Sequence, residues 1–241
     1  MPAHLMLLPG LMCDEAFWQP LQHGLPVVAC QVVDYGEADS LRSMAEAALA
    51  VAPARFALAG HSMGGRVALE IVRMAPSRVQ QLILMDTGYL QRSDGPPGAA
   101  ERAGRMALVK LAHDSGVRAM CREWVKGMVH PDRLEDTTLI ESIVAMFARK
   151  DAVRFARQQN ALLARPDASA VLAGLGRPCL MMCGRQDKWA TVAQHAAMQA
   201  LAQAAQMSVI EEAGHMVLME RPEPTTNAIY KFLESSTELA C

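Results

Sequence analysis

The chain lacks the features that mark membrane, secreted and nucleic-acid-binding proteins. No apolar run approaches the roughly 20 residues that a membrane span needs, and the opening segment, MPAHLMLLPG, carries no positively charged leader. Basic and acidic residues are mixed along the whole length, with a formal net charge of −2, so no basic run favours nucleic acid or anionic lipid. We therefore expect a small-molecule partner, with no nucleic acid and no membrane.

Paired cysteines are missing as well. The six cysteines are scattered and form no C-x-x-C pair, so neither a disulfide scaffold nor a zinc site is expected. Cys179 and Cys183 lie four residues apart on an expected strand and would face the same side as small apolar residues. The simplest interpretation is a reduced, cytoplasmic protein that needs no metal and no other cofactor.

What the chain does contain is enough apolar sequence for a large core. Apolar residues make up 51% and charged residues 20% of the 241 residues, which suits one α/β domain. Short apolar runs alternate with longer amphipathic stretches, a pattern typical of a parallel sheet covered by helices. The sequence predicts an α/β fold with a mostly parallel sheet of about six strands flanked by helices. The expected strands are Leu5–Leu8, Val27–Val33, Phe56–Ala59, Leu82–Met85, Leu180–Cys183 and Ser208–Ile210.

The alternation stops after the strand that ends near Met85. Residues 99–165 contain helix after helix and no convincing strand. We therefore predict a helical lid, or cap, over residues 88–177, inserted into a core domain formed by residues 1–87 and 178–241.

Residues 60–64, GHSMG, match the pattern G-x-S-x-G. An expected strand enters the motif and an expected helix leaves it, so Ser62 would lie on a sharp strand-to-helix turn. Such a turn crowds the backbone two residues to either side, which explains Gly60 and Gly64. The sequence predicts Ser62 as a nucleophile.

A serine nucleophile needs a base and an acid that orients the base. His215 follows the last expected strand, and Asp187 follows the strand before it, so both would lie at the same sheet edge as Ser62. Asp86, which also follows a strand, is the competing acid. His61 adjoins the serine on a tight turn and is interpreted as a packing residue. The predicted catalytic residues are Ser62, Asp187 and His215, in the chain order of this kind of site.

The other expected parts of the site are an oxyanion hole and a pocket. The backbone N–H groups of Met63 and of Leu11, in the loop after the first strand, are the expected oxyanion donors. Methionines and aromatic residues of the insert could line an apolar pocket, although such residues more often form the seam between packed helices. The pocket candidates are Trp189, Met216, Trp124 and Met146.

Five segments together resemble the α/β-hydrolase family, in its serine carboxylesterase branch: LLPGLMCDEAFW, AGHSMGGRVAL, LILMDTG, CGRQD and EAGHMVLMERPE. The same family includes carrier-protein methyl esterases, enol-lactonases and meta-cleavage-product hydrolases. The resemblance implies the fold, the lid, the triad and the oxyanion donors named above. The chain departs from the family at Pro9-Gly10, where most relatives carry His-Gly. With almost no sequence before the first expected strand, we expect the usual opening hairpin to be absent.

The leading hypothesis is hydrolysis of a small or medium carboxylic ester through an acyl-enzyme, by a monomer or homodimer. A C–C bond or enol-lactone hydrolase with the same triad is the alternative within enzymes, and a ligand-sensing signalling protein is the alternative outside them. Acyl transfer and perhydrolysis also remain open. The sequence does not predict which ester, or which acyl length, would be the substrate.

Overall fold

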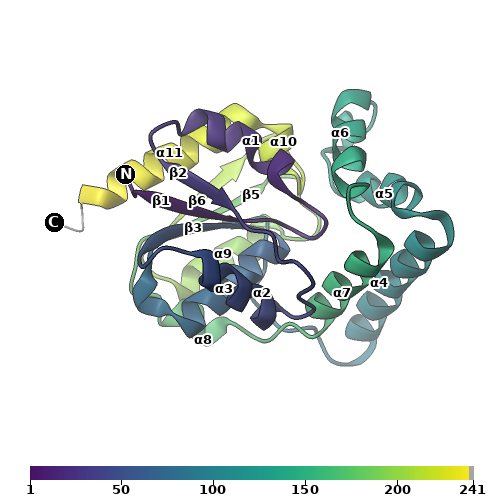
Figure 1. The fold of residues 1–241 in the computed structure, drawn as a ribbon, viewed down its shortest axis with the longest axis horizontal. Coiled ribbons are helices and arrows are strands. Elements are labelled where there is room, and N and C mark those ends of the chain that lie inside the picture. The colour runs from purple at the N-terminus through teal and green to yellow at the C-terminus, as the bar shows by residue number, and fades with distance from the viewer. Residues whose placement is uncertain (239–241) are drawn as a thin grey trace.

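The computed structural model describes residues 1–238 and contains a sheet of six strands, all paired in parallel, in the order β2-β1-β3-β4-β5-β6 (Figure 1). The predicted fold class is confirmed. The central strands are buried on both faces, which explains their continuous apolar sequence. The strands are β1 His4–Leu8, β2 Ala29–Val32, β3 Phe56–His61, β4 Val79–Met85, β5 Cys179–Gly184 and β6 Ala205–Ile210.

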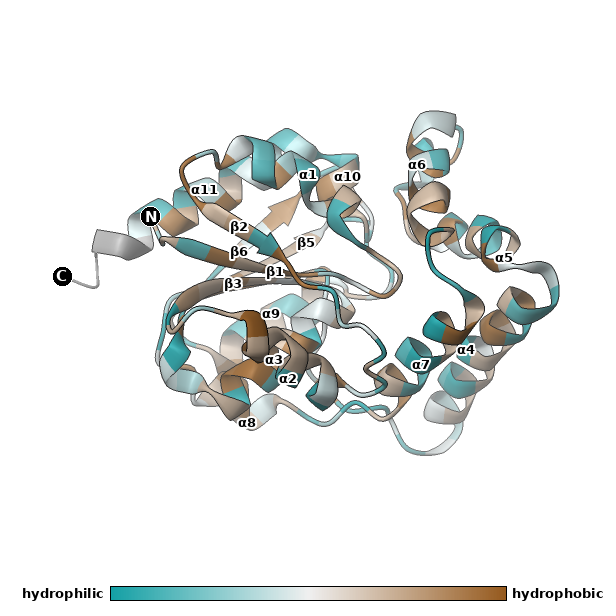
Figure 2. Ribbon diagram, viewed as in Figure 1, coloured by the Kyte–Doolittle hydropathy of each residue, from teal (hydrophilic) through white to brown (hydrophobic). Residues whose placement is uncertain are grey.

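Helices cover both faces of the sheet (Figure 1). One layer contains α1 (Glu15–Gly24), α10 (Val217–Glu220) and α11 (Pro222–Glu238), and the other contains α2 (Leu41–Val51), α3 (Met63–Met74), α8 (Ser169–Ala173) and α9 (Val192–Leu201). Coloured by hydropathy, these helices show both apolar and polar residues, as expected for helices that bury one side (Figure 2).

The helical lid follows β4 and lies beyond one end of the sheet (Figure 1). It consists of α4 (Gly95–Ser115), α5 (Val117–Trp124), α6 (Thr137–Phe147) and α7 (Ala152–Leu163). In this lid α4 packs against α5 and α7, and α5 packs against α6. By contrast, α8 packs against α3 and α9 of the core.

Polar contacts join the lid to the loop after β1. The backbone N–H of Met12 donates to Oε1 of Gln158 on α7, at 2.9 Å. Arg149 makes two hydrogen bonds of 2.8 Å to the carboxylate of Asp14, which also caps α1 through the N–H of Ala16. The lid is therefore fixed to the segment that the sequence assigns to the oxyanion hole.

Every strand has a boundary that differs by one to three residues from that expected; the central strand β4, for example, begins at Val79, three residues before the expected start. Val27 is 78% exposed and lies before β2, which forms one edge of the sheet and begins at Ala29. At the other edge, β6 begins at Ala205, three residues before the expected start. Edge strands are half exposed, so their apolar pattern marks their ends poorly.

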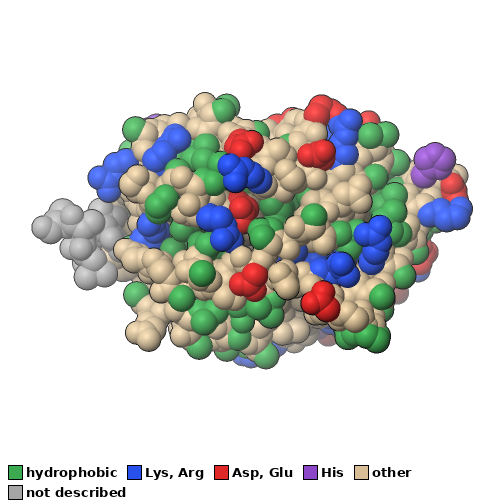
Figure 3. All heavy atoms as spheres, turned by 90° about the horizontal axis from the view of Figure 1, so that it is seen from below, with side chains coloured by type: hydrophobic (Ala, Val, Ile, Leu, Met, Phe, Trp, Pro, Cys, Tyr) green, Lys and Arg blue, Asp and Glu red, His purple; other side chains and the backbone are tan. Residues whose placement is uncertain are grey.

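Within residues 1–238, no helix has both the length and the apolar character required to cross a membrane. On the face seen in Figure 3, acidic and basic side chains are interspersed.

Candidate functional site

Ser62 lies at the turn between β3 and α3 with a φ of 53°, a left-handed conformation that is rare for a residue with a side chain. The turn is tight: a Cβ at Gly60 would lie 2.4 Å from the carbonyl oxygen of Gly64, and a Cβ at Gly64 would lie 2.0 Å from that of Leu8. Because both obstacles are backbone atoms, only glycine fits at the two positions. The strained turn is thus maintained by close packing on both sides.

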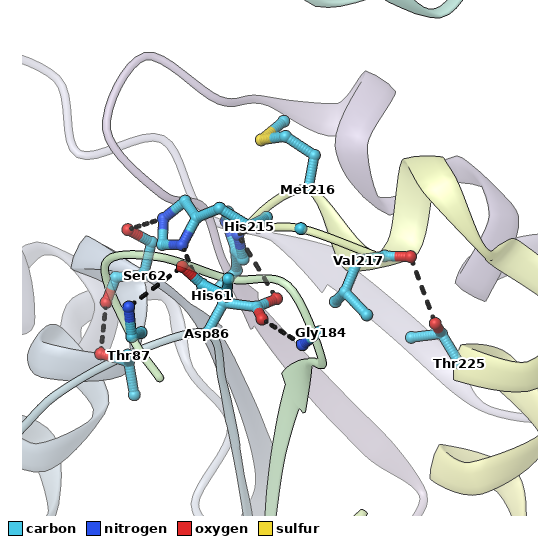
Figure 4. A network of polar contacts seen from close by, with 12 residues as sticks. His61, Ser62, Asp86, Thr87, Gly184, His215, Met216, Val217 and Thr225 are labelled. Atoms are coloured by element: carbon cyan, nitrogen blue, oxygen red, sulfur yellow. Dashed lines mark hydrogen bonds and ion pairs between the residues drawn. The ribbon is translucent and has the colours of Figure 1, made fainter. Parts of the chain in front are cut away.

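The side chains of Ser62 and His215 meet above the end of the sheet (Figure 4). The Oγ atom of Ser62 lies 2.9 Å from Nε2 of His215, and Nδ1 of the same ring lies 2.8 Å from Oδ2 of Asp187. Asp187 follows β5, and His215 follows β6. The structure therefore brings together the three side chains that the sequence singled out.

The carboxylate of Asp187 is held by several groups. Its Oδ1 accepts the N–H groups of Trp189 at 2.8 Å and of Ala190 at 3.0 Å. Burial opposes ionisation, but the charge and hydrogen bond of His215, with these two N–H groups, hold the pKa of the Asp187 carboxyl well below its usual range. An ionised Asp187 places the neutral ring's proton on Nδ1, which leaves Nε2 free to accept the Ser62 hydroxyl proton.

Asp86, the competing acid, is fully buried and does not bond His215. Its Oδ1 accepts the N–H of Gly184 at 3.0 Å, and its Oδ2 lies 3.9 Å from Nε2 of His61 (Figure 4). Burial, with the Asp187 carboxylate nearby, raises the pKa of Asp86 well above its ordinary value. The two acids therefore differ in the direction of their pKa shifts: that of Asp187 is lowered and that of Asp86 is raised.

His61 does more than pack. Its ring stacks on Phe17 with centroids 4.1 Å apart, and its Nε2–H donates to the backbone carbonyl of His215 at 2.8 Å. Burial and the nearby His215 lower the pKa of His61 to about 3, so the ring is neutral at pH 7. A Cβ at Gly10 would lie 2.6 Å from Nδ1 of this ring, so the loop after β1 also packs closely on His61.

Glu220, at the end of α10, holds the loop that carries His215. Its Oε1 accepts the N–H groups of Gly214 at 2.9 Å and Met216 at 3.2 Å, and its Oε2 accepts the N–H of His130 from the lid at 2.6 Å. The sequence analysis missed this residue. The signal was a single acid, five residues after His215, in the otherwise apolar segment MVLME.

A cavity of about 650 Å³ opens over Ser62 and His215, between the lid and the core. The expected oxyanion donors, Leu11 and Met63, contribute to its lining. In residues 1–238, no hydrogen bond within the chain uses the backbone N–H of Leu11 or of Met63. Both groups are therefore available to a ligand.

Three of the four pocket candidates also line the cavity. Trp124 and Trp189 stack with centroids 5.5 Å apart, Trp189 lies edge-on to the His215 ring at 4.9 Å, and Met216 lies beside them. The structure places Met146 elsewhere: its side chain is fully buried in the lid, and Phe147 lines the cavity instead. The helical pattern of α6 did not show which neighbour turns inward.

Comparison with known proteins places these observations in context. Residues 5–228 match the model of the Alpha/beta hydrolase family. The chain is 25% identical over 243 residues to the biotin biosynthesis bifunctional protein BioHC of Cellvibrio japonicus, an alignment that covers 96% of this chain but 47% of that protein. The chain thus spans about half the length of this relative.

Two further matches extend over nearly the full length of both chains. The pimeloyl-[acyl-carrier protein] methyl ester esterase of Aliivibrio salmonicida is 25% identical over 251 residues, covering 97% of this chain and 93% of that protein. A thermophilic esterase from Thermogutta terrifontis superposes with a TM-score of 0.84 at 24% identity, covering 97% of this chain and 90% of that one. At this identity the structural match supports the fold alone.

Proposed function

Because the chain belongs to the alpha/beta hydrolase family, we propose that it is a serine hydrolase that cleaves a small or medium carboxylic ester. One observation carries the proposal: the unbroken hydrogen-bond chain from Ser62 through His215 to the ionised Asp187, at the base of a cavity. Such a chain supplies what a serine hydroxyl lacks at neutral pH, a base held in the correct tautomer.

The proposed reaction has two halves. Oγ of Ser62 attacks the carbonyl carbon while Nε2 of His215 takes the hydroxyl proton, and Asp187 stabilises the resulting imidazolium. As the C–O bond breaks, the same proton passes to the leaving alkoxide, and the acyl group remains on Ser62. A water then attacks the acyl-enzyme, gives its proton to His215 and releases the acid, and the proton returns to Ser62.

The tetrahedral intermediate carries a negative oxygen that needs donors. The N–H groups of Leu11 and Met63 fit this role because they line the cavity beside Ser62 and have no bond within the described chain. The N-terminus of α3 adds a favourable electrostatic field at the same place.

An ester is the substrate class that the comparisons support best. The relative from Aliivibrio salmonicida is named as a methyl ester esterase, and this chain covers 93% of its length. Lactones and C–C bonds can be cleaved by the same three side chains, so the test includes them.

The test combines labelling and turnover. We expect a fluorophosphonate to label wild-type protein at Ser62 and short p-nitrophenyl esters to be hydrolysed, with both signals lost in Ser62→Ala. Ser142→Ala, which removes an exposed lid serine, is the matched control and should behave as wild type.

Equal ester turnover by wild type and Ser62→Ala would contradict the proposal. Labelling of Ser62 together with rapid cleavage of an enol-lactone or a vinylogous dienoate, and poor ester turnover, would replace the ester by those substrates. Stoichiometric ligand binding without turnover of any of them would favour a sensor.

A further inference from the structure

Three arginines from different elements line the cavity: Arg66 on α3, Arg105 on α4 and Arg165 just after α7. We call them the arginine cluster. They face a single lid carboxylate, Glu101 on α4, which also lines the cavity. Three fixed positive charges against one negative charge leave this end of the cavity with a surplus of positive charge.

The carboxylate of Glu101 is already shared by two members of the cluster. Its oxygens accept two hydrogen bonds from Arg165, at 2.7 and 2.8 Å, and one from Nε of Arg105, at 2.9 Å. These bonds lower the pKa of Glu101 to about 2 against the opposing effect of its burial, so it is ionised at neutral pH. Three of the roughly four acceptor sites of this carboxylate are therefore already used by Arg105 and Arg165.

Arg66 lacks a carboxylate partner. Its Nη1 donates to the backbone carbonyl of Leu90 at 2.9 Å, and no acid among the described residues lies within ion-pair distance of it. Burial, followed by repulsion from Arg165 and Arg105, lowers the pKa of Arg66 to about 9. Most of this shift comes from the burial of the guanidinium, and the two neighbouring arginines add to it.

A buried neutral side chain also belongs to the lining of this region. Gln159 on α7 is fully buried and lines the cavity. Its Oε1 accepts a hydrogen bond of 2.7 Å from Arg105. The NH₂ group (Nε2) of the same amide has no partner among the described residues. A buried amide donor without a partner is costly unless a ligand or a water supplies an acceptor.

We propose that the arginine cluster, with Gln159, is a subsite for a carboxylate at the far end of the substrate, so that the preferred substrates are half-esters of dicarboxylic acids. This inference rests on the proposed ester hydrolysis and specifies its substrate class. The scissile carbonyl lies at Ser62, and the free carboxylate accepts charge-assisted hydrogen bonds from Arg66 and Arg105 and the amide N–H of Gln159. Because the cluster joins α3 to the lid, an acidic substrate also bridges the two.

The test compares two series of esters that differ at one end. Mono-p-nitrophenyl esters of dicarboxylic acids from succinate to suberate are matched with p-nitrophenyl esters of monocarboxylic acids of equal length. At one chain length or more, we expect kcat/KM of the wild type to be at least about tenfold higher for the half-ester, since a charge-assisted pair contributes about 1.5–3 kcal/mol.

Two variants and a control localise the effect. Arg66→Gln and Arg105→Gln should each lower the ratio of half-ester to neutral-ester kcat/KM at least about fivefold. Arg73→Gln changes an arginine on the same helix that bonds Glu70 and the carbonyl of Asp167 outside the cavity, and it should leave the ratio unchanged.

A binding measurement separates this inference from the proposed function. Calorimetry with adipate, hexanoate and a phosphonate of equal length on Ser62→Ala requires no turnover. Tighter binding of adipate, lost in Ser62→Ala/Arg66→Gln, supports the subsite even if no ester is hydrolysed. Equal binding of adipate and hexanoate, or equal kcat/KM for both ester series at every length, would overturn it. Tighter binding of the phosphonate would overturn the assignment to a carboxylate.

Discussion

Around His215 the charge of each neighbouring side chain follows from what it contacts. Asp187 is ionised because two backbone N–H groups and the His215 ring stabilise its charge. Burial with few partners raises the pKa of Asp86 and lowers that of His61, and each leaves one polar side-chain atom without a hydrogen bond among the described residues. Two aspartates that follow adjacent strands thus have pKa values shifted in opposite directions.

Asp187→Asn tests the first of these assignments. The N–H groups of Trp189 and Ala190 fix the amide oxygen of the new side chain, so its NH₂ group must face His215. The ring then carries its proton on Nε2 and cannot accept one from Ser62, and we expect kcat to fall about 10⁴-fold. Steady-state ester kinetics measures this, with Asp86→Asn as the matched control. A loss below about tenfold would contradict the role of Asp187.

Asp86→Asn tests the second assignment through stability. The raised pKa means that Asp86 stabilises the fold fully below pH of about 4, its unfolded pKa, and that this contribution is lost as pH rises through the folded pKa. Asparagine keeps the acceptor for the Gly184 N–H and tolerates the φ of 46° at this position. The variant should therefore gain stability over wild type as pH rises, by about 1.4 kcal/mol per pH unit between the two pKa values. Thermal unfolding from pH 4 to 9 measures the difference, and a constant difference would contradict a raised pKa of Asp86.

At the residue scale, the sequence indicated the candidate catalytic side chains but not the residues that hold them in place. Ser62, Asp187 and His215 were found because each follows an apolar strand and their order matches the motif. The hydrogen bond from His61 to the backbone of His215 was not predicted, because it joins residues 154 positions apart in the chain. The arginine cluster was not predicted for the same reason, since its members come from three helical regions that lie far apart in the sequence.

Among the elements, the turn from β3 into α3 is the one most tightly determined by packing. Its geometry requires glycine at position 64, where a Cβ would meet the carbonyl oxygens of Leu8 at 2.0 Å and Pro9 at 2.7 Å. Neighbouring backbone atoms of a central strand have little freedom to move away.

We expect Gly64→Ala to reduce the free energy of unfolding by about 2–3 kcal/mol and to displace Ser62 from His215. Gly104→Ala, in the middle of α4 with no atom within 4 Å of the new Cβ, is the control and should stabilise the protein by about 0.5–1 kcal/mol. Chemical denaturation of both variants checks this. Similar free energies for the two variants would contradict the packing argument.

The strands were predictable from their short continuous apolar runs, and the long helices from their amphipathic periodicity. The short elements α8 and α10 were not, since four or five residues carry too little periodicity to be recognised. Their packing, against α3 and α9 for α8 and beside α1 and α11 for α10, is decided by tertiary contacts.

For the whole molecule, the arrangement of lid and core determines the cavity. The Met12–Gln158 hydrogen bond is buried and joins the lid to the loop that presents Leu11. Gln158→Leu should cost about 1–3 kcal/mol, because it leaves the Met12 N–H without an acceptor, and it should also lower kcat. Gln158→Glu keeps an acceptor for the Met12 N–H and should therefore retain most of the stability and most of the kcat of the wild type. Thermal unfolding and ester kinetics measure the two effects, and wild-type values for Gln158→Leu would show that the contact is unimportant.

The edge-on contact between Trp189 and His215, 4.9 Å between ring centroids, has an optical consequence. A protonated imidazole quenches the fluorescence of an adjacent indole, and the proposed reaction protonates His215 transiently in each turnover. The imidazolium of turnover is too short-lived to observe, but a fluorophosphonate adduct on Ser62 persists beside His215; its formation should change the emission of Trp189, and Trp189→Phe should reduce that change. Trp189 is thus a fluorophore that lies next to the proposed general base, His215.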